Sequence, residues 1–189
     1  MKKRFLLQTL ALAALAASTS GVMAQEKFKI GLVLPMTGQQ ATTGRQIEAA
    51  ARLYMAQHGD TVAGKKIELI VKDDTSLPDQ TRRLAQELIV NDKVNVLAGM
   101  GITPSAMAVA PLATQSKTPL VVMAAATSSI TEASPYIVRT SFTLPQASVA
   151  LADWAPKNGI KKVVTLVSDY GPGIDAAKFF KERLTFNGG

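Results

Sequence analysis

Short apolar runs alternate with segments of helical periodicity from residue 27 to the end of the chain. Short apolar runs bounded by Gly, Pro or Asp predict buried strands, and apolar positions recurring at i, i+3, i+4 and i+7 predict amphipathic helices. The strands predicted in this way cover residues 28–34, 67–72, 94–98, 120–123 and 162–168, with a short extended piece at 136–140. The predicted helices cover residues 44–58, 78–91, 104–116, 145–158 and 173–186.

Strands that alternate with helices of about 10–15 residues indicate right-handed crossovers and a parallel sheet. The expected fold class is therefore α/β, with a doubly wound parallel sheet. The units up to residue 123 build most of one sheet, whereas residues 145–189 read as the opening of a second sheet. A single strand with its helices cannot cover both faces of a sheet, so we expect one near-complete lobe plus the start of another.

Three helices carry more specific predictions. Pro111 lacks an amide hydrogen, so we expect a kink or a restart of the helix there. The buried stripe of the helix at 44–58 is predicted to consist of Ile47, Ala50, Ala51, Tyr54 and Met55. The candidate buried positions of the helix at 145–158 are Val149, Ala152 and Trp154.

The first 24 residues have the pattern of a secretory signal peptide. Three cations, Lys2, Lys3 and Arg4, precede an apolar run over residues 5–17, and small or apolar residues at 22–24 suit cleavage before Gln25. The alternative is a membrane anchor, but the run is shorter than the roughly 20 residues that span a bilayer. We expect a protein exported to a bacterial periplasm, with cleavage near Ala24.

Composition narrows the chemistry further. The 189 residues contain no Cys and one His, which excludes disulfides, thiolate metal sites, a Cys nucleophile and any multi-His metal site. The net charge of +7 falls to +4 without the three leader cations, and we therefore expect no nucleic-acid partner. No cofactor or metal is expected either.

Several motifs look chemical but favour a structural interpretation. The segment between Gly38 and Gly44 misses the spacing and the Lys of a phosphate-binding loop, and Gly99-Met100-Gly101 reads as a tight turn. One of the adjacent carboxylates Asp73 and Asp74 is expected to cap the next turn, and the two are not expected to share chemistry. His58 is expected to lie at a helix end, without a catalytic partner.

Ligands bind open parallel sheets beyond the carboxyl ends of the strands. The loops expected there are rich in Thr, Ser and Gly but hold no pair of a nucleophile and a base, which indicates binding without chemistry. Thr103 suits a helix N-cap with Pro104 in the first turn, which would leave the amides of Ser105 and Ala106 for a carboxylate. The alternative, that Thr103 only caps its own helix, stays open.

The order of several segments along the chain resembles the type I periplasmic solute-binding proteins, in the leucine/isoleucine/valine-binding group that serves ABC importers. The segments that carry this resemblance are FKIGLVLPMTG, the DDTS step, GMGITPSAMAVAPLA, PLVVMAAATSSIT, PYIVRT and SDYGPG, together with the leader. The resemblance implies a two-lobed clamp that closes on a ligand. Residues 25–141 would form lobe one, and residues 142–189 a crossover and the first part of lobe two.

The resemblance also implies the residues that line the cleft. The carboxylate-binding hydroxyl falls on Thr103 or Ser105, and the carbonyl and hydroxyl of the next loop fall on Ala125 or Ala126 and on Thr127. The residues Thr43 and Tyr170 fall at the remaining pocket positions. The acidic residue that would hold an ammonium group falls beyond residue 189.

The expected function is that of the extracytoplasmic substrate-binding component of an ABC importer, not an enzyme. Its partners would be the permease subunits in the inner membrane and a small polar ligand, an amino acid or another carboxylate or amide. Two alternatives stay open: a ligand-sensing receptor domain of the same fold and an exported α/β enzyme. The resemblance also implies urea, short amides and aromatic acids as ligands of family members, and we expect this chain by itself to bind ligand weakly or not at all.

Overall fold

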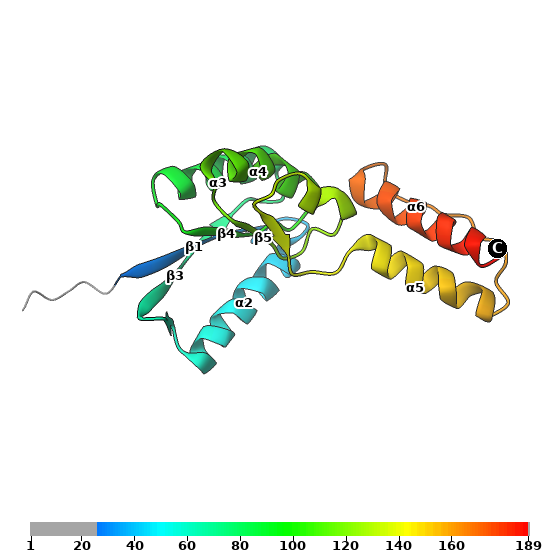
Figure 1. Cartoon of the computed structure of the whole chain (residues 1–189), viewed down its shortest axis with the longest axis horizontal. Coiled ribbons are helices and arrows are strands. Elements are labelled where there is room, and N and C mark those ends of the chain that lie inside the picture. The colour runs from blue at the N-terminus through cyan, green and yellow to red at the C-terminus, as the bar shows by residue number, and fades with distance from the viewer. Residues whose placement is uncertain (1–25, 189) are drawn as a thin grey trace, which may run out of the picture.

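The computed structural model describes residues 26–188, in which a mixed sheet carries helices on both faces and a pair of helices projects from one end (Figure 1). The strands are β1 (Lys27–Leu34), β2 (Thr61–Val62), β3 (Lys65–Asp73), β4 (Val96–Gly99), β5 (Leu120–Val122) and β6 (Ile137–Arg139). The helices are α2 (Ala41–His58), α3 (Pro78–Val90), α4 (Thr103–Ser116), the 3-10 helix η1 (Ser128–Glu132), α5 (Leu144–Lys157) and α6 (Gly171–Phe186). We call residues 27–139 the sheet unit and residues 144–186 the helical hairpin.

The sheet has the strand order β2-β3-β1-β4-β5-β6. Every pair is parallel except β2 with β3. The chain moves outward from β1 to β3, returns past β1 to β4, and then continues to β5 and β6. This confirms the predicted doubly wound α/β fold, and it places the topological switch point between β1 and β4, where ligands bind in such sheets. The two-residue strand β2 was not predicted.

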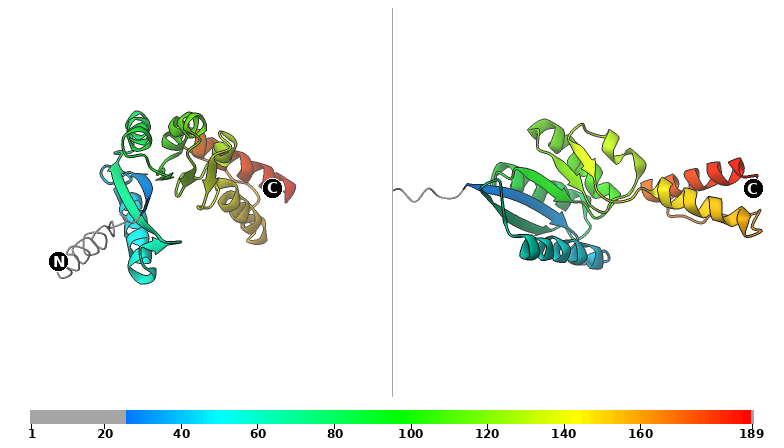
Figure 2. Two further views of the ribbon diagram at one scale, coloured as in Figure 1. Left: turned by 60° about the vertical axis from the view of Figure 1, so that its left-hand side comes forward. Right: turned by 60° about the horizontal axis from the view of Figure 1, so that its bottom comes forward.

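Alternate residues of β1 face opposite layers of the molecule, as the period of a strand requires. Val33 is fully buried in the main core with Leu88 of α3, Leu97 of β4 and Val109 of α4. Leu32 and Leu34 lie in a smaller cluster on the other face, against which Ile47 of α2 packs. Helices α3 and α4 thus cover one face of the sheet and α2 covers the other (Figures 1 and 2).

The predicted stripe of α2 is only partly buried. Ile47, Ala51 and Met55 are half-buried, but Ala50 is exposed and the Tyr54 side chain is 64% exposed. The prediction was therefore wrong for these last two residues. A single helix meets a flat sheet along a narrow line, so positions at the sides of the stripe stay in solvent.

The predicted strand at 162–168 is absent from the structure. These residues form neither helix nor strand, and the side chains of Val164 and Leu166 are 95% and 98% exposed. A strand exists through its hydrogen bonds to a neighbour, and the described residues pair no strand with this segment. The prediction of a strand at residues 162–168 was therefore wrong, because the amino-acid pattern alone does not form a strand without a neighbouring strand.

The remaining helix predictions were mostly correct. Helix α4 runs through Pro111 without a restart. In α5, Ala152 is fully buried as predicted, and Val149 is half-buried. Trp154 is 52% exposed, so the prediction that it is buried was wrong. Helices α5 and α6 lie side by side in every view (Figure 2). The predicted signal peptide at 1–24 lies outside the described residues, and within residues 26–188 none of the helices has the length and apolarity to cross a membrane.

Candidate functional site

The loops at the switch point are packed closely against one another. Gly99 has a φ of +113° and lies against the backbone carbonyl of Val33, and a side chain at Gly101 would come within 2.7 Å of the Pro35 ring. Glycine is needed at both positions because a Cβ would collide with the backbone of β1 at Gly99 and with the Pro35 ring at Gly101. The structural interpretation of Gly99-Met100-Gly101 is therefore correct: the glycines let the loops after β1 and β4 meet.

Two hydroxyl groups meet at the centre of this rim. Thr103, the first residue of α4, and Thr127, in the loop before η1, are joined by a 2.8 Å hydrogen bond between their Oγ1 atoms. Their exposed fractions are only 7% and 6%. Each hydroxyl still has further hydrogen-bonding capacity, because a Thr hydroxyl has one proton and two lone pairs.

Thr103 does not cap α4, contrary to one prediction. Ile102 occupies the N-cap position without a side-chain cap, and Thr103 and Pro104 are already in the helix. The amide of Ala106 donates to the Ile102 carbonyl at 3.2 Å, so it is not available to a carboxylate. The helix starts one residue earlier than expected, which turns the Thr103 hydroxyl toward Thr127 instead of toward its own backbone.

Ser105 points away from this pair. Its side chain is fully buried, and its Oγ lies 2.7 Å from the Thr81 hydroxyl of α3. Thr81 in turn donates to Asp74 at 2.8 Å. The three polar groups form a buried chain that fastens α3, α4 and the end of β3 together, and this satisfies the Ser105 hydroxyl inside the sheet unit.

The loop that carries Thr127 is held by its backbone. The amide of Ala125 donates to the Met100 carbonyl at 3.0 Å, and the carbonyl of Ala126 accepts from the Leu144 amide at 2.9 Å. The Arg139 guanidinium donates to the carbonyl of Thr127 at 2.5 Å. Ala125 is buried and Ala126 is half-buried.

Arg139 was missed by the sequence reasoning. It is the last residue of β6, and its cation lies next to the loop of Thr127. The available signal was its place at the carboxyl end of an extended run in a parallel sheet, which is the edge where ligands bind. That run, PYIVRT, was predicted to be extended and contributed to the family resemblance, but no residue in it was proposed for the site.

Asp73 organises the loop after β1. Its carboxylate accepts hydrogen bonds from the Met36 amide at 2.8 Å, the Thr37 hydroxyl at 2.6 Å and the Thr75 amide at 2.9 Å. Burial by itself would raise the pKa of the Asp73 carboxyl, but the hydrogen bonds from the Thr37 side chain and from these amides outweigh it and lower the pKa. Asp74 accepts from the Ser76 amide at 3.0 Å, so both carboxylates stabilise the turn, where only one was predicted to do so.

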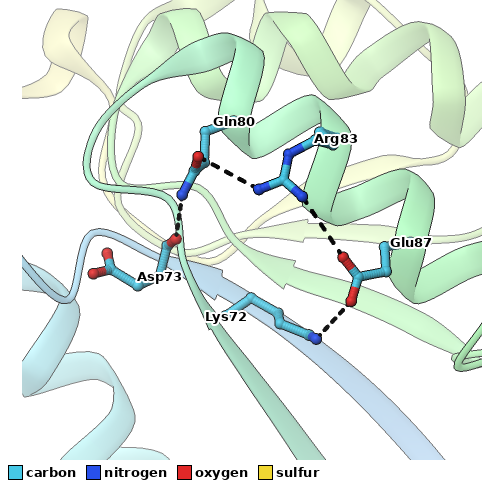
Figure 3. Close-up of polar contacts among 5 residues, drawn as sticks. All are labelled: Lys72, Asp73, Gln80, Arg83 and Glu87. Carbon is cyan, nitrogen blue, oxygen red and sulfur yellow. Dashed lines mark hydrogen bonds and ion pairs between the residues drawn. The ribbon is translucent and has the colours of Figure 1, made fainter.

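A polar network on the surface joins this corner to α3 (Figure 3). The Lys72 ammonium lies 2.8 Å from the Glu87 carboxylate, which also lies 4.0 Å from Arg83. Gln80 donates to the Asp73 carbonyl at 3.1 Å. The hydrogen bond from Lys72 lowers the pKa of Glu87. The network fixes α3 against β3, and thereby the turn from which Asp73 reaches the loop after β1.

The start of α6 lies against the hydroxyl pair. A Cβ added to Gly171, the first residue of α6, would be 3.6 Å from Thr103 Cγ2 and 3.7 Å from Thr127 Oγ1. Tyr170 occupies the N-cap position beside it and is 45% exposed. Thr43 is half-buried in the first turn of α2, where its amide donates to the Gln40 carbonyl. The structure thus brings Thr103, Thr127 and the Tyr170–Gly171 corner together.

The single His of the chain lies away from this rim and has a structural role. His58 is exposed, stacks on Tyr54 with ring centroids 4.2 Å apart, and places Nδ1 3.0 Å from the Tyr54 carbonyl. This agrees with its predicted place at a helix end. Within residues 26–188, no cluster of three or more His, Asp or Glu is suited to a metal ion.

A groove of about 250 Å³ lies between α5, α6 and the extended residues 163–167. Its lining is mostly aliphatic, with Ser148 and Thr165 as the polar members. It lies where no described strand packs against α5 and α6, because residues 162–168 form neither helix nor strand. The hydroxyl pair at the rim offers directed polar contacts, which the groove does not.

Comparison with known proteins identifies relatives of the whole described chain. Residues 27–189 match a family model described as periplasmic binding protein. The chain is 70% identical to a solute-binding protein of an ABC transporter from Rhodopseudomonas palustris BisB5, solved in complex with 3,4-dihydroxybenzoic acid; the match covers 86% of this chain and 45% of that one, with a TM-score of 0.84. A second such protein, from R. palustris HaA2 in complex with p-hydroxybenzoic acid, is 50% identical over 87% of this chain and 45% of its own, with a TM-score of 0.84.

A curated relative, Leu/Ile/Val-binding protein homolog 6 of Brucella abortus, is 45% identical over 99% of this chain and 47% of its own length. The chain therefore spans about half the length of the relatives it matches. The match to the family model covers far more than half of the chain, and the predicted resemblance is confirmed. The chain belongs to the periplasmic binding protein family.

Proposed function

We propose that this chain forms the N-terminal part of the extracytoplasmic solute-binding component of an ABC importer, and that its ligand is a hydroxylated benzoate. The observation that carries the proposal is the Thr103–Thr127 hydroxyl pair at the switch point of the sheet. The pair leaves one hydroxyl proton and several lone pairs for a solute, with no acid–base pair beside them among residues 26–188, which suits capture and release of a solute. Residues 25–141 and 142–189 would belong to the two lobes of the clamp.

One of the two predicted hydroxyls is better placed than the other to meet a carboxylate. The Arg139 cation, which donates to the Thr127 carbonyl, lies at the same loop as the Asp175 carboxylate, which is bonded to Ser128. Among the two hydroxyls predicted for carboxylate binding, Thr103 fits this role because its Oγ1 faces the rim, whereas the Ser105 hydroxyl is bonded to Thr81 inside the sheet unit. Thr127 contributes the second hydroxyl, and Ala125, Ala126, Thr43 and Tyr170 would border the same cleft.

The named ligands of the relatives support an aromatic acid. The solved structures at 70% and 50% identity contain 3,4-dihydroxybenzoic acid and p-hydroxybenzoic acid. Such a ligand pairs a carboxylate with an apolar ring and a phenolic hydroxyl. Export to the periplasm through residues 1–24 and delivery to permease subunits in the inner membrane follow from the same proposal.

A branched-chain amino acid is the second candidate ligand, because the Brucella relative is named a Leu/Ile/Val-binding homolog. An amino acid also needs an acceptor for its ammonium group. The Asp175 carboxylate of α6, which lies at the Thr127 loop, is already bonded to Ser128, and the acidic residue that the family resemblance implies for this role falls beyond residue 189. The preference for the aromatic acid therefore rests on the ligands named for the relatives at 70% and 50% identity.

Calorimetric titration tests the proposal. Residues 1–189 would be joined to the remaining half of the R. palustris BisB5 relative, and the product titrated with 3,4-dihydroxybenzoate, p-hydroxybenzoate, benzoate and leucine. We expect the hydroxybenzoates to bind most tightly. Binding of leucine with no response to any benzoate would favour the second candidate, and absence of binding by every carboxylate would refute the proposal.

The half taken from the R. palustris BisB5 relative could by itself determine which ligand binds most tightly. A variant in residues 1–189 is therefore the necessary control. Thr103→Val replaces the rim hydroxyl by a methyl group of similar volume, and should weaken hydroxybenzoate binding. The matched control Thr114→Val removes a hydroxyl of the same helix that is bonded to Ser134, away from the rim. Equal affinity of the Thr103→Val protein and the parent would remove Thr103 from the site.

A further inference from the structure

A single carboxylate connects the helical hairpin to the rim of the sheet unit. Asp175 of α6 accepts two hydrogen bonds from Ser128, the first residue of η1. Its Oδ2 accepts from the Ser128 amide at 2.9 Å and its Oδ1 from the Ser128 hydroxyl at 2.7 Å. The two residues are 47 positions apart in the sequence, so the contact is tertiary.

The placement of this contact relates it to the candidate site. Ser128 directly follows Thr127, whose hydroxyl bonds to Thr103. Asp175 lies four residues, about one helical turn, after Gly171, which faces the same hydroxyl pair. One face of α6 therefore lies against Thr103, Thr127 and Ser128. The bonds of Asp175 to Ser128 fix the distance between α6 and the loop that carries Thr127.

The chemistry of the contact suits a reversible closure. Hydrogen bonds to a carboxylate are shorter and stronger than bonds between neutral groups, and two of them to one residue also fix the orientation. Both residues are half-buried, so water can replace either bond when the units separate. The connection through residues 140–143 holds the chain together but leaves the angle between the units to contacts of this kind.

We propose that the Asp175–Ser128 contact is a latch that holds the two lobes in the closed arrangement and so positions the Thr103–Thr127 pair around the solute. The proposal rests on the proposed function, in which the sheet unit and the helical hairpin belong to the two lobes of a clamp. Asp175 is a positioning residue: it acts through the loop of Ser128 and needs no contact with the ligand.

Pulsed electron paramagnetic resonance on the whole chain, expressed with residues 1–24, tests the latch. The protein has no Cys, so spin labels at Arg82→Cys and Lys181→Cys would report only the distance between α3 and α6. Asp175→Ala should lower the ratio of short to long distances about tenfold, the effect of roughly one charge-assisted hydrogen bond. Asp175→Asn and Ser128→Ala should shift it in the same direction by less.

Glu182→Ala is the matched control, because it removes an exposed carboxylate from the same helix. It should leave the distance distribution as in the parent. An unchanged distribution in Asp175→Ala would overturn the proposal; if circular dichroism shows that this variant loses helix, an unchanged distribution in Asp175→Asn would overturn it instead. The measurement uses no ligand, so a failure of hydroxybenzoate binding would refute the proposed function and leave this result standing.

Discussion

In the sheet unit the apolar side chains of the strands lie beneath helices on both faces, whereas in the helical hairpin the apolar run at 162–168 is largely open to solvent. The main core of the sheet unit joins β1, β4 and β5 to α3 and α4. The core of the hairpin consists of Ala152, Ala155, Phe180 and Leu184, all from α5 and α6. The difference teaches that helices can pack as a pair, because each satisfies its own backbone, but a strand needs a neighbour.

The largest expected effect concerns the core of the sheet unit. Leu97 of β4 is fully buried among residues of α3, α4 and β5. Leu97→Ala should lower the free energy of unfolding by about 3 kcal/mol, because it removes buried apolar contacts and leaves a cavity. Urea unfolding followed by circular dichroism measures this value. A loss below about 1 kcal/mol would mean that the core is not packed as described.

The next effect concerns the corner where β3 meets the loop after β1. Asp73→Asn keeps the shape of the side chain but weakens its hydrogen bonds from Met36, Thr37 and Thr75. We expect the free energy of unfolding to fall by about 2 kcal/mol, the scale of hydrogen bonds to a charged group. Glu132→Gln, an exposed charge at the end of η1, is the control and should be close to neutral.

The same carboxylate predicts an acid dependence. Because the pKa of Asp73 is lowered in the folded protein, its stabilising contribution is fully present above the unfolded pKa of about 4 and is lost as the pH falls through the folded pKa. Asp153 of α5, whose pKa is lowered by Arg183 and then by Asn187, gives the hairpin a dependence of the same sign. The free energy of unfolding, measured between pH 7 and pH 2, should therefore depend less steeply on pH in Asp73→Asn than in the parent. An equally steep dependence in the two proteins would contradict this.

A smaller effect separates the hydroxyl of Thr127, in the loop before η1, from that of Ser105 in α4. In the completed protein, Thr127→Ala should weaken hydroxybenzoate binding by about 1–2 kcal/mol while stability changes little. Ser105→Ala should do the reverse, because its hydroxyl serves Thr81 inside the sheet unit. Calorimetry and thermal unfolding of both variants give the comparison. Unchanged affinity in Thr127→Ala would remove that residue from the site.

The smallest expected effect is the counterpart of the first. Leu166 was predicted to be a buried strand residue like Leu97, but its side chain is 98% exposed. Leu166→Ala in the 189-residue chain should change the free energy of unfolding by no more than about 0.5 kcal/mol. A loss approaching that of Leu97→Ala would show that the segment at 162–168 is packed in solution.

Most residues of the candidate site were proposed from local sequence, but their arrangement in space was not predicted. The Thr- and Ser-rich loops follow buried strands, so their place at the carboxyl edge could be read from the pattern. Which hydroxyls meet depends on the residue at which α4 begins. Because the helix starts one residue earlier than predicted, Thr103 faces Thr127 and Ser105 faces Thr81. Arg139 and Asp175 were missed because their partners, Thr127 and Ser128, lie 12 and 47 residues away.

The sequence by itself determined the order and kind of most elements, the doubly wound α/β fold and the polar character of the switch-point loops, because hydrophobic period and turn residues act over a few positions. Tertiary structure alone decided which apolar runs became strands, which side of α2 was buried, and which hydroxyls and charges came together. These depend on partners distant in the chain, and the segment at 162–168 shows the reason most directly. Its pattern is that of a strand, yet without a neighbouring strand its backbone has no ladder to join.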